Sequence, residues 1–225
     1  MTHVLDNPIY SALTSGNKHF AVGDDTAFYF QQDVAPFAGM KDNSADEFAA
    51  LINNMPDESV FVIFSRNEVA IPEGLKVLRH FKMFQMVYEG DTPAAQMNSL
   101  LSDLANEHID EMLTLTKLTN PGPFLQRTIE FSNYTGVISD GKLVAMAGHR
   151  MQPLPYVEIS AVCTHPEHTG RGYAAKLLTE QIKRIIGAGK IPFLHVLQEN
   201  AGAVSVYERI GFKTRVPMLG YVLGK

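Results

Sequence analysis

The segment of residues 157–186 constrains the fold more than any other part of the chain, because it joins a strand to a helix through a turn with two glycines. Residues 157–163, VEISAVC, are mostly apolar and include β-branched side chains, which is typical of a strand. Residues 172–186 carry apolar side chains at helical spacing. Gly170 and Gly172 allow unusual backbone dihedrals and the close approach of a ligand. Since the first N–H groups of a helix have no partner within it, this turn is a candidate phosphate site.

The same turn also has a purely structural interpretation, in which the glycines only make a tight connection between the strand and the helix. The G-x-G pattern by itself does not separate the two interpretations. Two other phosphate-binding patterns are excluded. The chain has no G-x-x-x-x-G-K-(S/T), and the turn is not the G-x-G-x-x-G of a dinucleotide-binding unit.

The elements around the turn indicate an α/β (α+β) architecture with a mixed sheet and helices packed on it. Residues 133–139 and 142–149 are two predicted strands separated by Asp140-Gly141, a strong hairpin signal. After the helix, the pattern predicts in chain order a strand over 193–197, a helix over 201–210 and one or two strands over 212–223.

The chain before the hairpin is less regular. Apolar residues at three- and four-residue spacing predict one long helix or two short helices over residues 92–116. Further upstream, the pattern predicts a short helix over 8–13, a strand over 27–31, a helix over 44–52, and strands over 59–64 and 84–88. We therefore expect a smaller N-terminal α/β unit over residues 1–80 and a larger domain over residues 81–225.

Composition excludes several classes of protein. The formal net charge of -5 over 225 residues does not favour a nucleic-acid or anionic-membrane partner. No window approaches the roughly 18 apolar residues of a membrane span, and the N-terminus lacks the features of a signal peptide. Cys163 is the single cysteine, so no internal disulfide forms. We expect a cytoplasmic protein, and we expect no metal site because the histidines and the cysteine lack ligand spacing.

Residues 164–174, THPEHTGRGYA, resemble the pyrophosphate-binding motif of the GNAT acetyltransferases, (Q/R)-x-x-G-x-(G/A). Thr169 departs from that motif, where the family has Gln or Arg. Residues 200–212 are similar to the family's second signature, N-x-x-A-x-x-x-Y-E-(K/R)-x-G-F, and residues 136–148 are similar to its central hairpin. The resemblance covers residues 130–225 and is closest to the glycine N-acyltransferase-like branch. It implies the GNAT fold.

The resemblance also implies acetyl-CoA as the acyl donor. It assigns the pyrophosphate to the motif, namely Thr169, Gly170, Arg171, Gly172, Tyr173 and Ala174, and adds Asn200 and Ala203 from the second signature. The pantetheine arm would bind like an added strand to the backbone of Val162, Cys163 and Thr164, where two strands of the family's sheet splay apart. A backbone N–H near Val162 would polarise the thioester carbonyl.

Tyr207 matches the family's general-acid tyrosine, which would protonate the departing thiolate. The alternative is a tyrosine whose ring belongs to the core. Glu158 is the candidate general base, and we expect partial burial to raise its pKa. Its alternatives are a charge on a solvated strand face or a group that only orients the amine. His165, His168 and His195 are further candidates for the base, although His195 fits a structural position better.

The resemblance implies transfer of an acetyl or other short acyl group to a primary amine by direct attack. A nucleophilic Cys163 is disfavoured because no partner histidine is identifiable. Two other functions stay open, namely a non-catalytic acyl-CoA-binding sensor or scaffold and an α/β binding protein whose glycine turn is only structural. The acceptor is expected to be a small amine or an amino acid, with a protein N-terminus or lysine as alternatives. Dimerisation is common in the family, so the resemblance adds a homodimer to the expectations. One interpretation of the N-terminal unit is a degenerate half of a second acetyltransferase-like sheet, which would extend the main sheet and cap the acceptor site.

Overall fold

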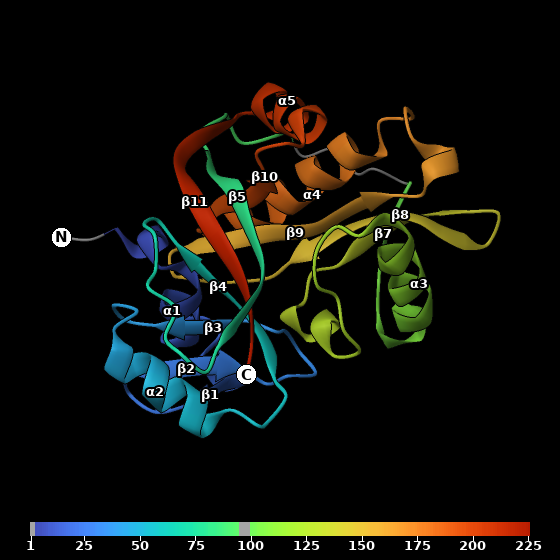
Figure 1. Cartoon of the computed structure of the whole chain (residues 1–225). Coiled ribbons are helices and arrows are strands. Elements are labelled where there is room, and N and C mark those ends of the chain that lie inside the picture. The colour runs from blue at the N-terminus through green and yellow to red at the C-terminus, as the bar shows by residue number, and fades with distance from the viewer. Residues whose placement is uncertain (1–2, 95–99) are drawn as a thin grey trace.

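An eight-stranded mixed sheet forms the centre of the computed structural model, which describes residues 3–94 and 100–225 (Figure 1). The strand order is β4-β11-β5-β10-β9-β8-β7-β6. The strands are β4 (Val60–Ser65), β5 (Lys76–Tyr88), β6 (Leu101–Asp103), β7 (Thr135–Ser139), β8 (Lys142–His149), β9 (Tyr156–Thr164), β10 (Ile191–Leu197) and β11 (Phe212–Gly224). The predicted mixed sheet flanked by helices is confirmed.

The hairpin and the elements that follow it have the predicted positions. β7 and β8 pair in antiparallel register around Asp140 and Gly141, whose positive φ angles of 52° and 73° suit a two-residue hairpin turn. Three further predicted elements are observed as α4 (Tyr173–Gly187), β10 and α5 (Ala201–Ile210). α5 ends at Gly211, whose φ of 116° is the left-handed conformation that commonly closes a helix.

The two faces of the sheet are covered by different parts of the chain (Figure 1). α4 and α5 pack on one face, where Leu178, Ile182 and Ile185 meet the apolar residues of β9 and β10. On the other face lie α1 (Pro8–Leu13), α3 (Ile109–Thr119) and a small antiparallel sheet. The large sheet is therefore buried on both sides along its middle strands.

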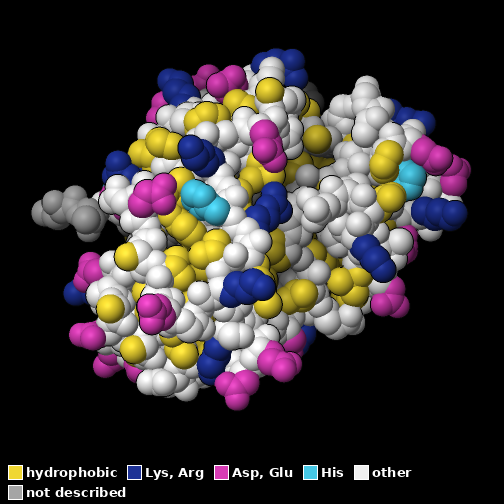
Figure 2. Space-filling view, in the orientation of Figure 1, with side chains coloured by type: hydrophobic (Ala, Val, Ile, Leu, Met, Phe, Trp, Pro, Cys, Tyr) yellow, Lys and Arg dark blue, Asp and Glu magenta, His cyan; other side chains and the backbone are white. Residues whose placement is uncertain are grey.

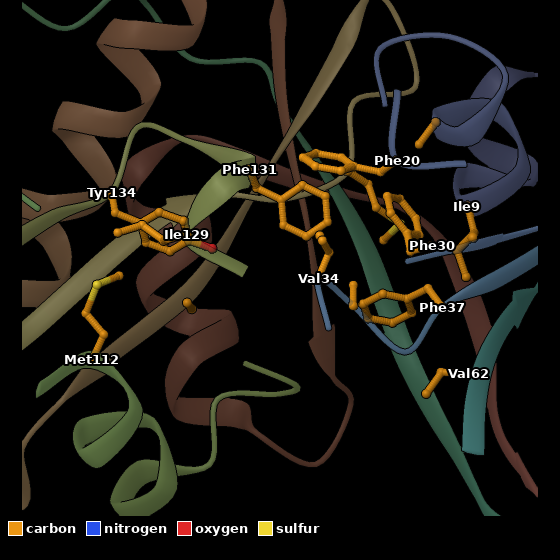
Figure 3. Close-up of a cluster of buried hydrophobic side chains, with 14 of the residues drawn as sticks. Ile9, Phe20, Phe30, Val34, Phe37, Val62, Met112, Ile129, Phe131 and Tyr134 are labelled. Atoms are coloured by element: carbon orange, nitrogen blue, oxygen red, sulfur yellow. The ribbon is translucent and has the colours of Figure 1, made fainter. Parts of the chain in front are cut away.

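The N-terminal residues are part of this second layer. The small sheet contains β1 (Ala21–Gly23), β2 (Ala27–Phe30) and β3 (Ala38–Met40), and α2 (Ala45–Asn54) covers it. Its connection to the large sheet is a parallel bridge between Phe37 and Val62 of β4. A buried cluster joins aromatic rings of this layer to rings near β7 (Figure 3), including Phe30, Phe131 and Tyr134.

The predicted division at residue 80 stays a prediction. β5 runs across that position as one strand, longer than the strand predicted over 84–88. β4 lies at the edge of the large sheet, on the far side of β11. The N-terminal chain thus contributes both a separate small sheet and one edge of the large one.

The helix predicted over residues 92–116 is wrong in its extent. Residues 95–99 lie outside the described residues, and Leu101–Asp103 forms strand β6, paired with β7. The helix α3 begins only at Ile109. The three-residue spacing of Leu101 and Leu104 comes from an edge strand and the turn after it, because Leu104 packs where Gly136 leaves room.

The C-terminal residues form one strand, β11, which pairs with both β4 and β5. A register shift between Thr214 and Val216 places Arg215 in a bulge. Pro217 is tolerated because β4 pairs with β11 only from Leu219 onward. Among the described residues, no helix is long and apolar enough to cross a membrane.

The packing of α1 on β3 depends on Gly39. A Cβ atom at this position would lie 2.5 Å from the backbone N of Tyr10, so Gly39→Ala must push the helix away from the strand. We expect the free energy of unfolding to fall by about 1–3 kcal/mol in urea titrations. Gly187→Ala is the control, because a Cβ atom there has no neighbour within 4 Å. Equal stability of the two variants would contradict this packing.

Candidate active site

The parallel pairing of β9 and β10 is short. The two strands pair only at Ile191 with Tyr156, at Pro192 with Val157 and at Phe193 with Glu158. β9 continues to Thr164 and β10 to Leu197, so the rest of each strand has no partner on the facing edge. The splayed strands that the family resemblance implied at residues 162–164 are therefore observed, with free backbone groups on both edges.

A bulge in β9 coincides with this gap. Between the pairs that join Met146 to Cys163 and Gly148 to Ser160, β9 has one residue more than β8. Ala161 in this bulge has a φ of 52°, which is uncommon for a residue other than glycine. Bulges of this kind redirect backbone and side-chain groups beside active sites. The bulge also contains Val162, the residue whose N–H is the predicted oxyanion donor.

The glycine turn opens onto solvent at the start of α4. Gly170 and Gly172 have φ angles of 77° and 74°, as the sequence predicted for a turn that needs glycine. A Cβ atom at either position would have no neighbour within 4 Å, so the backbone here is accessible. No side chain caps the α4 N-terminus and no acidic residue lies in its first turn. This end of the helix is suited to an anion.

The other motif residues surround this turn. The Thr169 hydroxyl donates a hydrogen bond to the Pro166 carbonyl at 2.9 Å, so this side chain closes its own loop. Arg171 is exposed, and Tyr173 packs half-buried against the cluster that contains Leu177. Ala174 follows in the first turn of α4.

A cavity of about 460 Å³ passes through the gap between β9 and β10. On the face of the sheet that α4 covers, the cavity is lined by Val162, Asn200 and Tyr207. Val162 and Tyr207 pack against the apolar cluster that α4 and α5 form with the sheet. From the opposite side it is lined by Phe37 and Phe64 of the N-terminal layer. The cavity therefore connects the two faces of the sheet at the point where its strands separate.

Tyr207 lies in this cavity, as required of a residue that would reach a thioester in the gap. Burial raises the pKa of its phenol to about 12, so the hydroxyl is protonated at neutral pH. Its ring contacts Phe212 with centroids 6.1 Å apart. Asn200 also lines the cavity, while its Oδ1 accepts a hydrogen bond from the Ala203 N–H at 3.1 Å and caps α5.

Glu158 is fully buried and its carboxylate is saturated with hydrogen bonds. Arg150 donates from Nε to Oε2 at 2.7 Å and from Nη2 to Oε1 at 2.6 Å, and His195 Nδ1 lies 2.7 Å from Oε1. The expected rise in the pKa of Glu158 is wrong. Burial opposes ionisation, but the neighbouring guanidinium outweighs it and lowers the pKa to about 2. The role of Glu158 as general base stays a prediction, and its contacts with Arg150 and His195 do not favour that role.

The tautomer of His195 follows from a row of side chains across four strands. Arg215 Nη1 donates to Gln85 Oε1 at 2.8 Å, and an arginine can only donate. Gln85 Nε2 therefore donates to the Leu5 carbonyl and to His195 Nε2, at 2.8 Å and 3.1 Å. His195 must then carry its proton on Nδ1 and donate it to Glu158. Both ring nitrogens are occupied, which fits the structural role expected for this histidine.

The remaining candidates do not line this cavity. His165 and His168 line a separate groove of about 790 Å³ between α3, the β7–β8 turn and the loop before α4. Cys163 is buried, and burial raises the pKa of its thiol to about 11, which disfavours a thiolate nucleophile. Within the described residues, no group of three or more His, Cys, Asp or Glu side chains is placed to hold a metal ion.

Sequence reasoning missed the two arginines of the cavity, Arg79 and Arg150. Arg150 directly follows β8, and its guanidinium lies 4.9 Å from the centre of the Phe37 ring. Arg79 belongs to the part of β5 that was not predicted as a strand. Short sequence patterns do not identify either arginine as a cavity residue, because the cavity lies between strands that are distant in sequence.

The buried ion pair predicts a specific loss of stability in acid. Since the pKa of Glu158 falls from 4.5 in the unfolded chain to about 2, its stabilisation is present above the unfolded value and is lost as the pH falls towards 2. Glu158→Gln should lower the free energy of unfolding by about 3–5 kcal/mol near neutral pH. The variant should also show a shallower decline than the wild type in urea titrations between about pH 5 and pH 2.

The exposed residue Glu73 provides the control, because Glu73→Gln removes a carboxylate without removing a buried ion pair. This variant should follow the wild-type curve. A Glu158→Gln protein with wild-type stability and wild-type acid sensitivity would contradict the description of the ion pair.

The chain is similar in sequence and in structure to proteins of one family. The model of the FR47-like protein family matches residues 134–218. A crystal structure of a GNAT-family protein from Novosphingobium aromaticivorans is 32% identical, with a TM-score of 0.93, and the match covers 100% of this chain and 99% of that one. No curated protein gives a significant match.

More distant structures share the fold. A GCN5-related N-acetyltransferase from Kribbella flavida is 14% identical with a TM-score of 0.64, covering 96% of this chain and 94% of that one. A GNAT-family acetyltransferase from Colwellia psychrerythraea is 15% identical with a TM-score of 0.54, covering 94% and 96%. The near-complete match at 32% identity decides the assignment, and the chain belongs to the GNAT family of acetyltransferases.

Proposed function

We propose that the protein transfers an acetyl or other short acyl group from acyl-CoA to a primary amine by direct attack. The observation that carries the proposal is the cavity between β9 and β10. It passes through the sheet beside Tyr207 and Val162, at the level where the two strands lose their pairing. An acyl donor entering from the α4 side and an amine entering from the opposite side would meet there.

The donor would be held by the backbone. The accessible N–H groups of residues 170–174 would bind the pyrophosphate, supported by a helix dipole worth about 0.3–1 kcal/mol. The pantetheine arm would hydrogen-bond to the unpaired edge of β9 at Val162, Cys163 and Thr164. Thr169 would contribute little, because its hydroxyl already bonds to Pro166.

The chemistry proposed at the gap balances without a further reactant. The amine nitrogen forms a bond to the thioester carbonyl carbon while the Val162 N–H stabilises the developing oxyanion. The nitrogen, which is positively charged after attack, releases one proton to solvent. The C–S bond breaks, and the departing thiolate takes a proton from Tyr207, which regains one from solvent. The raised pKa keeps this phenol protonated at neutral pH, so its proton is available to the thiolate.

Glu158 has a different role in this proposal from the base predicted from the sequence. Its two oxygens are occupied by Arg150 and His195, and its pKa of about 2 makes it a weak base. We propose that Glu158 positions Arg150 and that the acceptor loses its proton to solvent before attack. The small amine or amino-acid acceptor, the glycine N-acyltransferase-like branch, the homodimer and the cytoplasmic location stay predictions.

A negative charge introduced at Gly170, in the turn before α4, tests the proposed pyrophosphate site. Gly170→Asp and Gly170→Asn place side chains of nearly equal size at a position with positive φ that both residues tolerate. Only aspartate adds a negative charge next to the phosphates. We expect calorimetry to show acetyl-CoA binding at least about tenfold weaker for Gly170→Asp than for Gly170→Asn. Equal affinities would place the pyrophosphate elsewhere.

A thiol-release assay and substitution of Tyr207 distinguish an enzyme from a non-catalytic acyl-CoA-binding module. We expect wild-type protein to release free thiol from acetyl-CoA in the presence of an accepted amine. Tyr207→Phe should lower kcat about 100-fold with little change in the KM for acetyl-CoA, because only the proton donor is lost.

Tyr88→Phe is the matched control. Its hydroxyl donates to the Asp91 carbonyl, and Tyr88 does not line the cavity. Unchanged turnover in Tyr207→Phe would remove this residue from the mechanism. An absence of thiol release from wild-type protein that binds acetyl-CoA would favour the binding module.

A further inference from the structure

The half of the cavity that faces the N-terminal layer combines aromatic walls with positive charge. Phe37, Phe64 and Phe81 line it, together with Arg79 and Arg150. In Figure 2, Lys and Arg side chains lie beside exposed hydrophobic side chains along the course of β5 and β11. The full set of lining residues contains no aspartate or glutamate. If the acyl donor occupies the α4 side, as the proposed function requires, this half is left for the acceptor.

The two arginines differ in what they can offer to a ligand. Nε and Nη2 of Arg150 bind Glu158, which balances its charge. Nη1 of Arg150 has no hydrogen-bond partner among the described residues, and it lies 3.9 Å from where a Cβ atom of Gly122 would be, at the cavity wall. Arg150 therefore contributes a fixed donor and no net charge.

Arg79 supplies the net charge. Its guanidinium lies 5.2 Å from the centre of the Phe81 ring, and no acidic side chain pairs with it in the parts of the chain that the structure describes. Stacking on an aromatic ring orients a guanidinium while its N–H groups remain available. One uncompensated positive charge matches a carboxylate better than a doubly charged phosphate, and arginine binds carboxylates in bidentate geometry.

From these contacts we propose that the acceptor is an amine that carries a carboxylate and an apolar or aromatic side chain. Arg79 binds the carboxylate, Arg150 Nη1 donates a further hydrogen bond, and the phenylalanine rings contact the side chain. The amine then points towards the gap between β9 and β10. This inference rests on the proposed acyl transfer and narrows its acceptor to the amino-acid class.

The test compares amines that differ only in the carboxylate. Phenylalanine and phenethylamine form one pair, and leucine and isoamylamine form another. With acetyl-CoA as donor, we expect wild-type kcat/KM to be at least about tenfold higher for each amino acid, because a charge-assisted contact is lost in its decarboxylated partner. Equal or better use of the decarboxylated amines would overturn the inference and leave acyl transfer intact.

Arg79→Gln removes the charge at a surface-accessible position. We expect the KM for phenylalanine to rise about tenfold or more, with no change for phenethylamine or for acetyl-CoA. Lys82→Gln is the matched control, because Lys82 is exposed on the same strand and does not line the cavity. Comparing variants also cancels the difference in amine pKa between the two acceptors. An unchanged preference in Arg79→Gln would overturn the role of Arg79.

A binding measurement separates failure of this inference from failure of the proposed function. N-acetylphenylalanine should raise the Tm of wild-type protein saturated with CoA, whereas N-acetylphenethylamine should not, and Arg79→Gln should lose the shift. A shift without thiol release from either amine would retain the carboxylate site and reject acyl transfer. The absence of both the shift and thiol release would reject both.

Discussion

The early end of the pairing between β9 and β10 is the constraint on which the site depends. Parallel neighbours in a buried sheet normally bond along their whole length, and unpaired backbone groups in the interior are costly. Here the pairing stops at Phe193 and Glu158. The bulge that contains Ala161 lies in β9 just beyond the last paired residue. The gap leaves polar backbone edges inside the molecule and a cavity that reaches both faces.

The row of buried polar side chains lies at the point where the gap begins. Glu158 belongs to the last paired position, and the row continues from it through His195 and Gln85 to Arg215. A buried ion pair of this kind contributes little net stability compared with apolar packing, but removing one partner is costly. The row fixes the orientation of Arg150 and the tautomer of His195, so it defines one wall of the cavity. It also ties the N-terminal segment to the sheet, because Gln85 donates to the Leu5 carbonyl.

Much of the architecture was predictable where local chemistry determines it. The Asp140-Gly141 hairpin and the turn at Gly170 and Gly172 were found because these backbones need positive φ angles, which few residues provide. The segment over residues 92–116 was mispredicted, because leucines three residues apart suit an edge strand with its following turn as well as a helix. Edge pairing with β7 decided between them, and no local pattern records that contact.

The candidate active site was likewise predictable only where a local motif determines it. The position of Tyr207 beside the gap followed from a motif, whereas the ionisation of Glu158 did not, because its pKa is set by Arg150 on the neighbouring part of the sheet. The contribution of Phe37 and Arg79 to the cavity depends on the N-terminal layer folding back over the sheet. The order of the strands and the packing of the layers determine these contacts, so patterns within short segments of sequence do not predict them.

The most direct test is a crystal structure of the protein with CoA. The diphosphate should lie against the backbone N–H groups of residues 170–174, the pantetheine should hydrogen-bond to β9 in the gap, and the sulfur should lie in the cavity next to Tyr207. CoA bound outside the gap, or β9 and β10 closed onto each other along their full length, would contradict the placement of the active site.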